Sequence, residues 1–288
     1  MKTEVLQLDG SPQDLQKIRH AAKLLQAGAL VAFPTETVYG LGADATNAEA
    51  VERLNEAKGR PPGKPYSLLV PSQRHAEELA GGFSRIAAKL TRLYWPGPLT
   101  IVVPRRGGGA VGLRLPEHPV TRGLLAQCGF PLAAPSANRS GNPDPTTVAD
   151  ILRDLDGKIP LILDGGPARQ GKSSSVVFLE PRRPPDIRRE GLIRKDEILE
   201  AARPAVTFVC TGNTCRSPMA EALFKQGLKA KGLEREWGLP FLVRSSGTNA
   251  QDGRPADPQA VEALRELKLS LGAHGASALT PALVDNSD

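Results

Sequence analysis

A cysteine and an arginine, Cys210 and Arg216, carry the most specific chemical pattern in the sequence, within the stretch VCTGNTCRSP (209–218). The residues between them follow a strand-like run and precede a helix, so their backbone N–H groups can turn inward around a phosphoryl group. The partial charge of the helix N-terminus and the guanidinium of Arg216 favour the thiolate of Cys210, which is the nucleophilic form. Ser217 can hydrogen-bond to the sulfur, and Asn213 can brace the loop. The pattern predicts a phosphate-binding loop.

This loop resembles that of the low-molecular-weight protein tyrosine phosphatase family, and Thr214 resembles the branch that removes phosphate from arginine side chains. The stretches 245–261 and 274–281 continue the likeness. The family protonates its leaving group with an aspartate of an Asp-Pro loop that lies beyond two further strands. The pair at 257–258 is also Asp-Pro, but it is expected to begin a helix. The resemblance implies a truncated phosphatase domain without a general acid, and we expect it to be inactive.

A second set of chemically capable side chains lies in the first 203 residues. Lys58 and Arg60 lie two positions apart on a Gly/Pro-rich loop, where both can reach one triphosphate. Ser136 and Asn138 form a Ser-x-Asn element with the same spacing. Taken alone, a basic residue is ordinarily a surface charge, and a Ser-x-Asn element is ordinarily a turn. Only the surrounding motifs decide between these interpretations.

Six stretches resemble, in order, the threonylcarbamoyl-AMP synthase family of YrdC/Sua5-like enzymes. They are PTETVYGLGADA (34–45), KGRPPGKPYSLLV (58–70), WPGPLT (95–100), GLRLPEHP (112–119), APSANRSGNP (134–143) and GKSSSVV (171–177). The resemblance implies an enzyme that condenses L-threonine, bicarbonate and ATP and releases pyrophosphate. Its product would supply the threonylcarbamoyl group of adenosine 37 in tRNA. A carbamate formed from threonine can attack the α-phosphate directly, so catalysis would come from positioning and charge neutralisation.

The same resemblance assigns roles to individual residues. The catalytic set that it implies is Lys58, Arg60, Ser136 and Asn138. The substrate-binding set that it implies is Thr35, Arg114, Ser174, Ser175 and Arg189. Mg²⁺ is expected only through ATP, and tRNA and the threonylcarbamoyl transferase machinery are expected partners. The four histidines are scattered without ligand spacing, so no structural metal is predicted.

Composition and charge limit the class of protein. The formal net charge is +6, and the sequence pI is about 9.3, which favours anionic partners but is equally compatible with a solvated basic surface. Only 4% of the residues are aromatic, which disfavours stacking as the main binding mode. The three cysteines form no even disulfide framework, and no signal peptide or membrane-spanning run is recognisable. We therefore expect a cytoplasmic protein that contacts no membrane.

The elements that must position these residues alternate along the chain. Strand-like runs are expected at 29–33, 67–70, 99–103, 111–115, 131–134, 160–163 and 175–179, with helices around 84–94, 118–128 and 146–155. An earlier helix is expected from a Ser11 cap to Gly28, and 34–45 is expected to be a loop. This alternation predicts an α/β fold. The resemblance makes it an open twisted YrdC/RibB-like sheet with helices on its faces.

Arg203-Pro204 should end the last helix of this region, and AVTFV (205–209) should start a new strand. We therefore predict a synthase domain over 1–203 and a partial α/β phosphatase domain over 204–288 that starts strand–phosphate loop–helix. Two alternatives stay open. One is a non-catalytic RNA-binding module, which would not need the Lys/Arg and Ser-x-Asn quartet. The other is a protein that acts chiefly as a tyrosine or arginine phosphatase.

Overall fold

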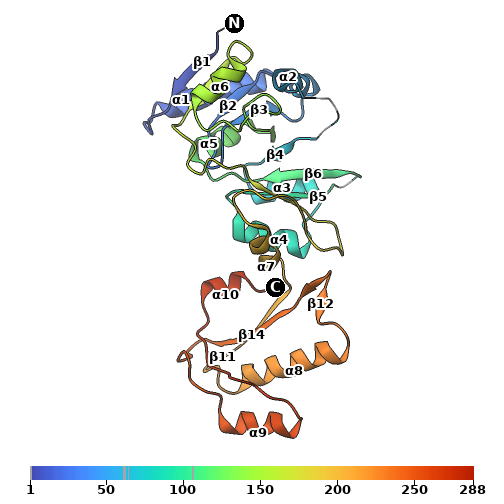
Figure 1. The fold of residues 1–288 in the computed structure, drawn as a ribbon. Helices are drawn as coiled ribbons and strands as arrows, with labels where there is room; N and C mark the ends of the chain where they lie inside the picture. Colours follow the sequence, from blue (N-terminus) through green and yellow to red (C-terminus); the bar gives the residue numbers. More distant parts are fainter. Residues whose placement is uncertain (1, 61–62, 64, 106) are drawn as a thin grey trace. The chain divides into compact units, whose positions relative to one another are not determined.

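A computed structural model of the chain describes residues 2–60, 63, 65–105 and 107–288 (Figure 1). The chain forms two compact units. The first comprises residues up to 87, 94–180 and 185–195, and the second comprises 88–93, 181–184 and 196–288. The second unit thus includes residues before position 204, and the boundary between residues 203 and 204 stays a prediction.

A ten-stranded mixed sheet, ordered β1-β8-β2-β3-β7-β4-β6-β5-β9-β10, forms the frame of the first unit. Its strands are β1 (Glu4–Gln7), β2 (Val31–Phe33), β3 (Gly40–Asp44), β4 (Ser67–Leu69), β5 (Leu99–Pro104), β6 (Ala110–Arg114), β7 (Leu132–Ala133), β8 (Leu161–Asp164), β9 (Ser175–Phe178) and β10 (Asp186–Arg189). The pairs β1–β8, β8–β2, β4–β6 and β5–β9 are parallel, and the remaining pairs are antiparallel. The predicted open α/β sheet is confirmed.

Helices cover both faces of this sheet, as the alternation of buried residues along β8 shows. Leu161 and Leu163 pack in one cluster with α1 (Asp14–Gln26) and α5 (Pro119–Cys128). Ile162 packs in the other cluster with α2 (Ala48–Lys58) and α6 (Val148–Leu155). Successive side chains of a strand point to opposite faces, so the two clusters lie on opposite sides of the sheet. The other helices that begin before residue 204 are α3 (Gln73–Ala80), α4 (Arg85–Tyr94) and α7 (Lys195–Ala201).

Two local predictions were wrong. The segment 34–45 contains strand β3, because Gly40 and Gly42 leave room for the ring of Phe33: a Cβ on Gly42 would lie 2.6 Å from its Cε1. Glycine carries little strand propensity, which is why the pattern indicated a loop. The Ser11 cap was also wrong. Helix α1 begins at Asp14, whose N–H donates to the Ser11 carbonyl at 3.0 Å, so the residues before it form a turn.

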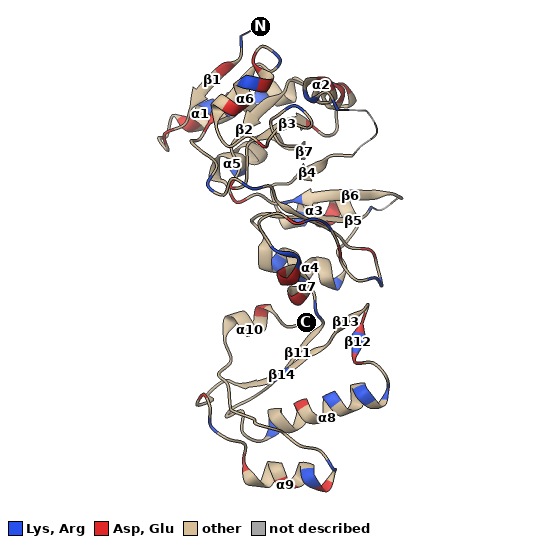
Figure 2. Cartoon of the chain, viewed as in Figure 1, with Lys and Arg blue, Asp and Glu red and all other residues tan. Residues whose placement is uncertain are grey.

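The second unit contains the predicted strand–loop–helix. Parallel strands β11 (Ala205–Cys210) and β14 (Leu242–Gly247) pair in register, and α8 (Arg216–Ala230) follows the loop after β11. The other elements that begin after residue 204 are β12 (Arg235–Glu236), β13 (Leu239–Pro240), α9 (Pro258–Glu266) and α10 (Pro281–Asp285). Figure 2 shows that the charged residues of this unit lie mainly on its helices and turns rather than on β11.

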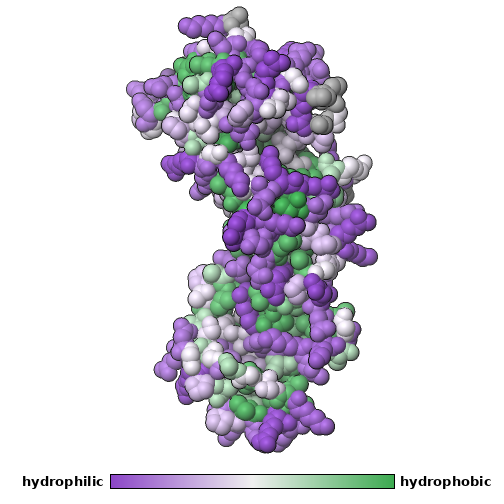
Figure 3. Space-filling model, in the orientation of Figure 1, coloured by the Kyte–Doolittle hydropathy of each residue, from purple (hydrophilic) through white to green (hydrophobic). Residues whose placement is uncertain are grey.

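Burial in this part of the chain is limited. Only Ser217 and Pro218 of α8 are buried, and Leu223 on the same helix is 47% exposed. Apolar residues accordingly reach the visible surface of the second unit (Figure 3). None of the described helices has the length and apolar composition of a membrane span.

Candidate functional site

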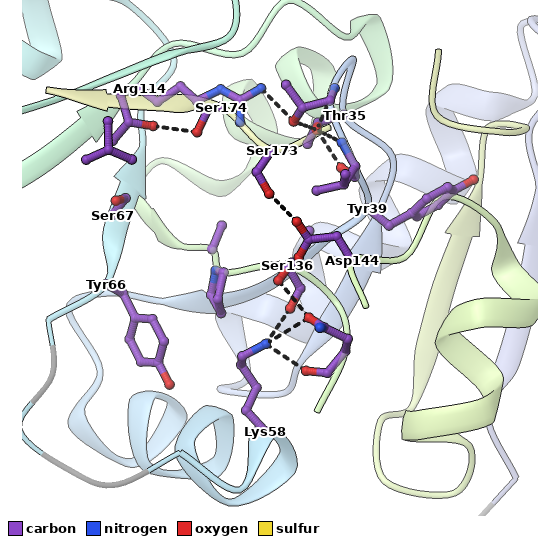
Figure 4. Close-up of a pocket in the computed structure, with 18 of the residues that line it drawn as sticks. Thr35, Tyr39, Lys58, Tyr66, Ser67, Arg114, Ser136, Asp144, Ser173 and Ser174 are labelled. Atoms are coloured by element: carbon purple, nitrogen blue, oxygen red, sulfur yellow. Dashed lines mark hydrogen bonds between the residues drawn. The ribbon is translucent and has the colours of Figure 1, made fainter. Parts of the chain in front are cut away.

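A cavity of about 460 Å³ lies in the first unit, where the loop after β2, the end of α2, strands β4 and β6 and the segments 134–144 and 173–176 meet (Figure 4). The predicted synthase residues that line it are Thr35, Lys58, Arg60, Arg114, Ser136, Asn138, Ser174 and Arg189. The structure thus brings together side chains from six separate stretches of the sequence. Four of them are cationic, so the cavity suits an anionic ligand.

Lys58 is buried at the C-terminus of α2, which Asn47 caps at its start and left-handed Gly59 ends. Its Nζ donates to the carbonyl oxygens of Ser136 and Asn138 at 2.6 and 2.7 Å, and to Asn138 Oδ1 at 3.3 Å (Figure 4). Burial and the nearby charge of Arg60 lower the pKa of Lys58 to about 8. An ammonium has three protons, so Lys58 uses all of its donors to hold this segment.

The Ser-x-Asn element completes its own hydrogen bonds. Ser136 Oγ donates to Asn138 Oδ1 at 2.6 Å, and Asn138 Nδ2 donates to the carbonyl of Asn142 at 2.6 Å. The backbone between them is anchored to the residue before β3, since the Ala137 N–H donates to the Tyr39 carbonyl. The predicted proximity of this element to Lys58 is therefore present in the structure. Its catalytic role stays a prediction.

Arg60 stacks its guanidinium over the ring of Tyr66, 4.5 Å from the ring centroid, and its Nη2 donates to the Pro65 carbonyl at 3.2 Å. Its Nε is buried, and no described atom accepts a hydrogen bond from it. The hydroxyl of Tyr66 donates to Asn55 Oδ1 at 2.7 Å, which fixes the ring. The sequence analysis missed Tyr66, although this aromatic residue belongs to the same motif as Arg60.

Arg114 is buried beside the loop after β2. Its Nη2 donates to Glu36 Oε1 at 2.5 Å and to Thr37 Oγ1 at 3.0 Å, and its Nε donates to the Gly97 carbonyl at 3.1 Å. Thr35 belongs to the same network, because its hydroxyl lies 2.8 Å from Thr37 Oγ1. Neither Glu36 nor Thr37 was singled out in the sequence, although both belong to the PTETVYG stretch.

Ser174 and Arg189 also line the cavity. Arg189 donates from Nε to the Ser174 carbonyl at 3.0 Å and from Nη2 to its hydroxyl at 3.2 Å. Ser175 differs: it does not belong to the cavity lining, and its hydroxyl donates to the Ile193 carbonyl at 2.6 Å while accepting from the Gly191 and Ile193 N–H groups. Its hydroxyl is fully engaged by backbone, and no geometry supports a substrate contact for Ser175.

Asp144 is a further lining residue that the sequence analysis missed, although it lies one position beyond the APSANRSGNP stretch. It accepts a hydrogen bond from the Ser173 hydroxyl (Figure 4). Among the described lining residues it is the one carboxylate. No group of three or more His, Cys, Asp or Glu side chains in the described part of the chain is arranged to hold a metal ion.

The phosphate loop lies between β11 and α8 in the second unit. The Asn213 N–H donates to Cys210 Sγ at 3.2 Å, and the Ser217 hydroxyl lies 3.0 Å from the same sulfur. Burial opposes ionisation, but the Ser217 hydroxyl and the backbone N–H groups of the loop outweigh it and lower the pKa of Cys210. Asn213 holds the left-handed turn of the loop, with φ of 52°, and its Nδ2 donates to Ser217 Oγ at 2.9 Å. Both predicted bracing contacts are present.

The remaining loop residues are held from outside. Thr214 accepts from the Asp257 N–H at 2.8 Å through its carbonyl oxygen, and Arg216 is exposed and donates from Nη2 to Thr211 Oγ1 at 3.3 Å. The Asp257 side chain caps α9 by accepting from the Gln259 N–H, which is the helix start that the sequence predicts. A loop of inward N–H groups beside a polarised thiol can hold an anion next to a nucleophile.

Comparison with known proteins separates the same two regions. Residues 23–191 match the profile of the Sua5/YciO/YrdC family, which is described as "Telomere recombination". Residues 205–288 match the low molecular weight phosphotyrosine protein phosphatase family.

Two relatives and one structure illustrate the likeness of the first region. The threonylcarbamoyl-AMP synthase of Bacillus subtilis is 41% identical over 192 residues, which cover 63% of this chain and 55% of that protein, so the chain spans about half its length. A putative threonylcarbamoyl-AMP synthase of Mycobacterium tuberculosis is 36% identical over 207 residues, which cover 69% of this chain and 94% of that protein. The crystal structure of P. abyssi Sua5 complexed with L-threonine superposes with a TM-score of 0.65 at 28% identity, covering 99% of this chain and 96% of that one. Since the first profile spans more than half of the sequence, the chain belongs to the Sua5/YciO/YrdC family.

Proposed function

We propose that the first unit is an L-threonylcarbamoyladenylate synthase, which makes threonylcarbamoyl-AMP and pyrophosphate from L-threonine, bicarbonate and ATP. The observation that carries this proposal is the convergence of four cationic side chains on one cavity: Lys58, Arg60, Arg114 and Arg189. The substrates bring a triphosphate, a carboxylate and a bicarbonate, all of which need fixed positive charge. The names of the relatives, and the L-threonine bound to the P. abyssi protein, support the same substrate class.

The proposed reaction needs no nucleophile from the protein. The amine of threonine and bicarbonate give a carbamate with loss of water. A carbamate oxygen then forms a bond to the α-phosphorus of ATP, and the bond from that phosphorus to the pyrophosphate oxygen breaks. Arg60 and Arg189 would neutralise the charge on the phosphates, while Arg114 would take the threonine carboxylate. Lys58 would act by holding the Ser136–Asn138 segment in place.

Mg²⁺ would enter this site with ATP. Magnesium is usually bound through one or two carboxylates together with substrate phosphates, and Asp144 is the carboxylate of the described lining. When bound, the ion would offset charge on the phosphates. The product would serve the modification of adenosine 37 in tRNA, with tRNA and the threonylcarbamoyl transferase machinery as further proposed partners.

Pyrophosphate release tests the proposal. It is measured with and without L-threonine and bicarbonate for the wild type, for Lys58→Ala and for Lys23→Ala, whose side chain is exposed on α1. Release should require both co-substrates, fall about 100-fold in Lys58→Ala and stay unchanged in Lys23→Ala. Circular dichroism establishes that each variant is folded. A folded wild type that binds RNA without releasing pyrophosphate would replace the synthase with the RNA-binding alternative.

The polarised thiol of Cys210 favours a second candidate function, hydrolysis of a phosphotyrosine or phosphoarginine. Against it stands the expectation from the sequence that this region lacks a general acid and is inactive. Phosphatase activity that disappears in Cys210→Ser would establish the second function. Absence of turnover in the folded wild type would support the expected inactivity.

A further inference from the structure

Glu36 is a buried carboxylate beside the cavity that the proposed chemistry does not use. Only 4% of it is exposed. Its Oε1 accepts the bond from Arg114, and its Oε2 accepts from the Glu117 N–H at 3.1 Å. A buried charge is costly unless it is paired and hydrogen-bonded, and both oxygens of Glu36 meet this condition. Glu36 therefore joins the loop after β2, the end of β6 and the segment before α5.

Hydroxyl groups on the same loop fix Arg114 from a second direction. Thr35 donates its single hydroxyl proton to the Val38 carbonyl at 2.5 Å. In the contact between the two threonine hydroxyls, Thr37 must then be the donor. Thr37 Oγ1 has no proton left, so it can only accept the bond from Arg114 Nη2. The two Nη2 protons of Arg114 are thus committed to Glu36 and Thr37.

This arrangement leaves one end of the guanidinium for a ligand. Arginine has five N–H donors, of which Nη2 and Nε here use three, the last toward Gly97. The two donors on Nη1 meet no acceptor among the described residues. Since Arg114 lines the cavity, Nη1 is the part of the side chain that remains to bind a substrate.

We propose that Glu36 is a positioning residue for L-threonine, which fixes Arg114 so that Nη1 receives the substrate's carboxylate. This inference rests on the proposed function. It opposes the expectation from charge alone. A negative charge 2.5 Å from Arg114 weakens the attraction of that side chain for another carboxylate, so a purely electrostatic role predicts tighter threonine binding once the charge is removed. A positioning role predicts weaker binding.

Glu36→Gln separates these two expectations. The amide keeps the shape of the side chain but places an NH2 donor where one of the two oxygens was, so either Arg114 or the Glu117 N–H loses its acceptor. Isothermal titration calorimetry should show L-threonine binding weakened about tenfold, as expected for a lost charged hydrogen bond, and ATP binding changed by less than twofold. The matched control is Glu49→Gln, a carboxylate that is exposed and paired with Arg53 on α2. It should change neither affinity.

Steady-state kinetics supply a second readout. In Glu36→Gln the KM for threonine should rise, while kcat at saturating threonine stays near that of the wild type. If Glu36→Gln does not fold, Thr37→Val removes the other Nη2 acceptor and should weaken threonine binding about threefold. Unchanged or tighter threonine binding in these variants, or an equal loss for threonine and ATP, overturns the positioning role. A folded wild type that neither binds threonine nor releases pyrophosphate overturns the proposed function itself.

Discussion

In the cavity of the first unit, oxygen acceptors surround cationic side chains, whereas in the loop of the second unit donors surround a sulfur atom. Lys58 is held by two carbonyls and an amide oxygen, and Arg114 by a carboxylate, a hydroxyl and a carbonyl. Cys210 instead receives an N–H bond and lies next to a hydroxyl. Both regions suit an anion. The cavity stabilises cationic side chains, whereas the loop stabilises a sulfur atom.

The difference separates two ways of handling phosphorus chemistry. Under the proposed function, the cavity supplies fixed positive charge and a substrate supplies the attacking atom. In the loop, the Ser217 hydroxyl and backbone N–H groups lower the pKa of the Cys210 thiol. The cationic residues of the cavity therefore depend on buried partners, and their removal should affect stability as well as function. The loop should respond mainly in the reactivity of its thiol.

Arg114→Ala should produce the largest effect. It leaves Glu36 buried without its cation, and breaking a buried ion pair in this way costs about 3–5 kcal/mol. Urea denaturation measures this loss as a lower free energy of unfolding of the first unit. Arg74→Ala breaks an exposed pair with Glu78 and should cost less than about 1 kcal/mol. Equal losses of stability in the two variants would show that burial does not decide how much an ion pair contributes to the free energy of unfolding.

The parts of the fold that sequence analysis predicted are those with strong local patterns. Apolar runs such as 99–103 and 160–163 became strands β5 and β8, and the helix expected around 118–128 became α5. The missed elements lack such patterns. Strand β1 is mostly exposed, and β10 contains Arg188 and Arg189 within a Pro/Arg-rich stretch. Their pairing with β8 and β9 is a tertiary contact that no local propensity encodes.

The candidate site shows the same limit. The motifs identified which stretches meet, but not which side chain of a stretch reaches the cavity. In GKSSSVV the hydroxyl of Ser174 lines it, while that of the adjacent Ser175 turns to the backbone of Ile193. In PTETVYG the buried Glu36 accepts from Arg114 across 78 sequence positions. Such pairings follow from sheet register, which the sequence alone left open.

Ser217→Ala should have an intermediate effect, confined to the loop. It removes a hydrogen bond that lowers the pKa of Cys210, so that pKa should rise toward its usual value near 9.0. At pH 7 the thiolate fraction falls about tenfold for each unit of that rise. Iodoacetamide alkylation, followed in a Cys215→Ser background, measures the fraction. The rate of Cys210 alkylation should drop in Ser217→Ala, and the midpoint of its pH profile should move to higher pH.

Ser270→Ala is the matched control for the loop, because the Ser270 side chain is exposed and accepts a hydrogen bond from the Gly272 N–H. It should leave the alkylation rate unchanged. If Ser217→Ala also leaves it unchanged, the backbone N–H groups alone set the reactivity of Cys210. The donors that distinguish the loop from the cavity would then be backbone N–H groups alone, without the Ser217 hydroxyl.

The smallest effect should come from titrating Lys58. Its pKa of about 8 arises from burial first and from Arg60 second, so pyrophosphate release should fall as pH rises through 8 and the ammonium loses a proton. Arg60→Gln removes the second cause and should raise the pKa of Lys58, moving the falling limb of the normalised profile upward by less than about one unit. Arg74→Gln, in an exposed pair with Glu78, should not move it. A limb that stays in place in Arg60→Gln would show that another group titrates there.

Loss of the same Lys58 proton should have the opposite effect on stability: it lowers pyrophosphate release but favours the folded state. The unfolded lysine keeps its proton up to about 10.5, whereas the folded one loses it near 8. Between these values the unfolded lysine binds more protons than the folded one, so the contribution of Lys58 to the free energy of unfolding should rise with pH. Comparison of urea denaturation of the wild type and Lys58→Met across this pH range measures that contribution. Cys210 also has a lowered pKa, but its charged form is the deprotonated one, which the loop stabilises. Loss of a proton thus makes Lys58 easier to bury and less able to hold its segment, while it makes Cys210 both better bound and more reactive.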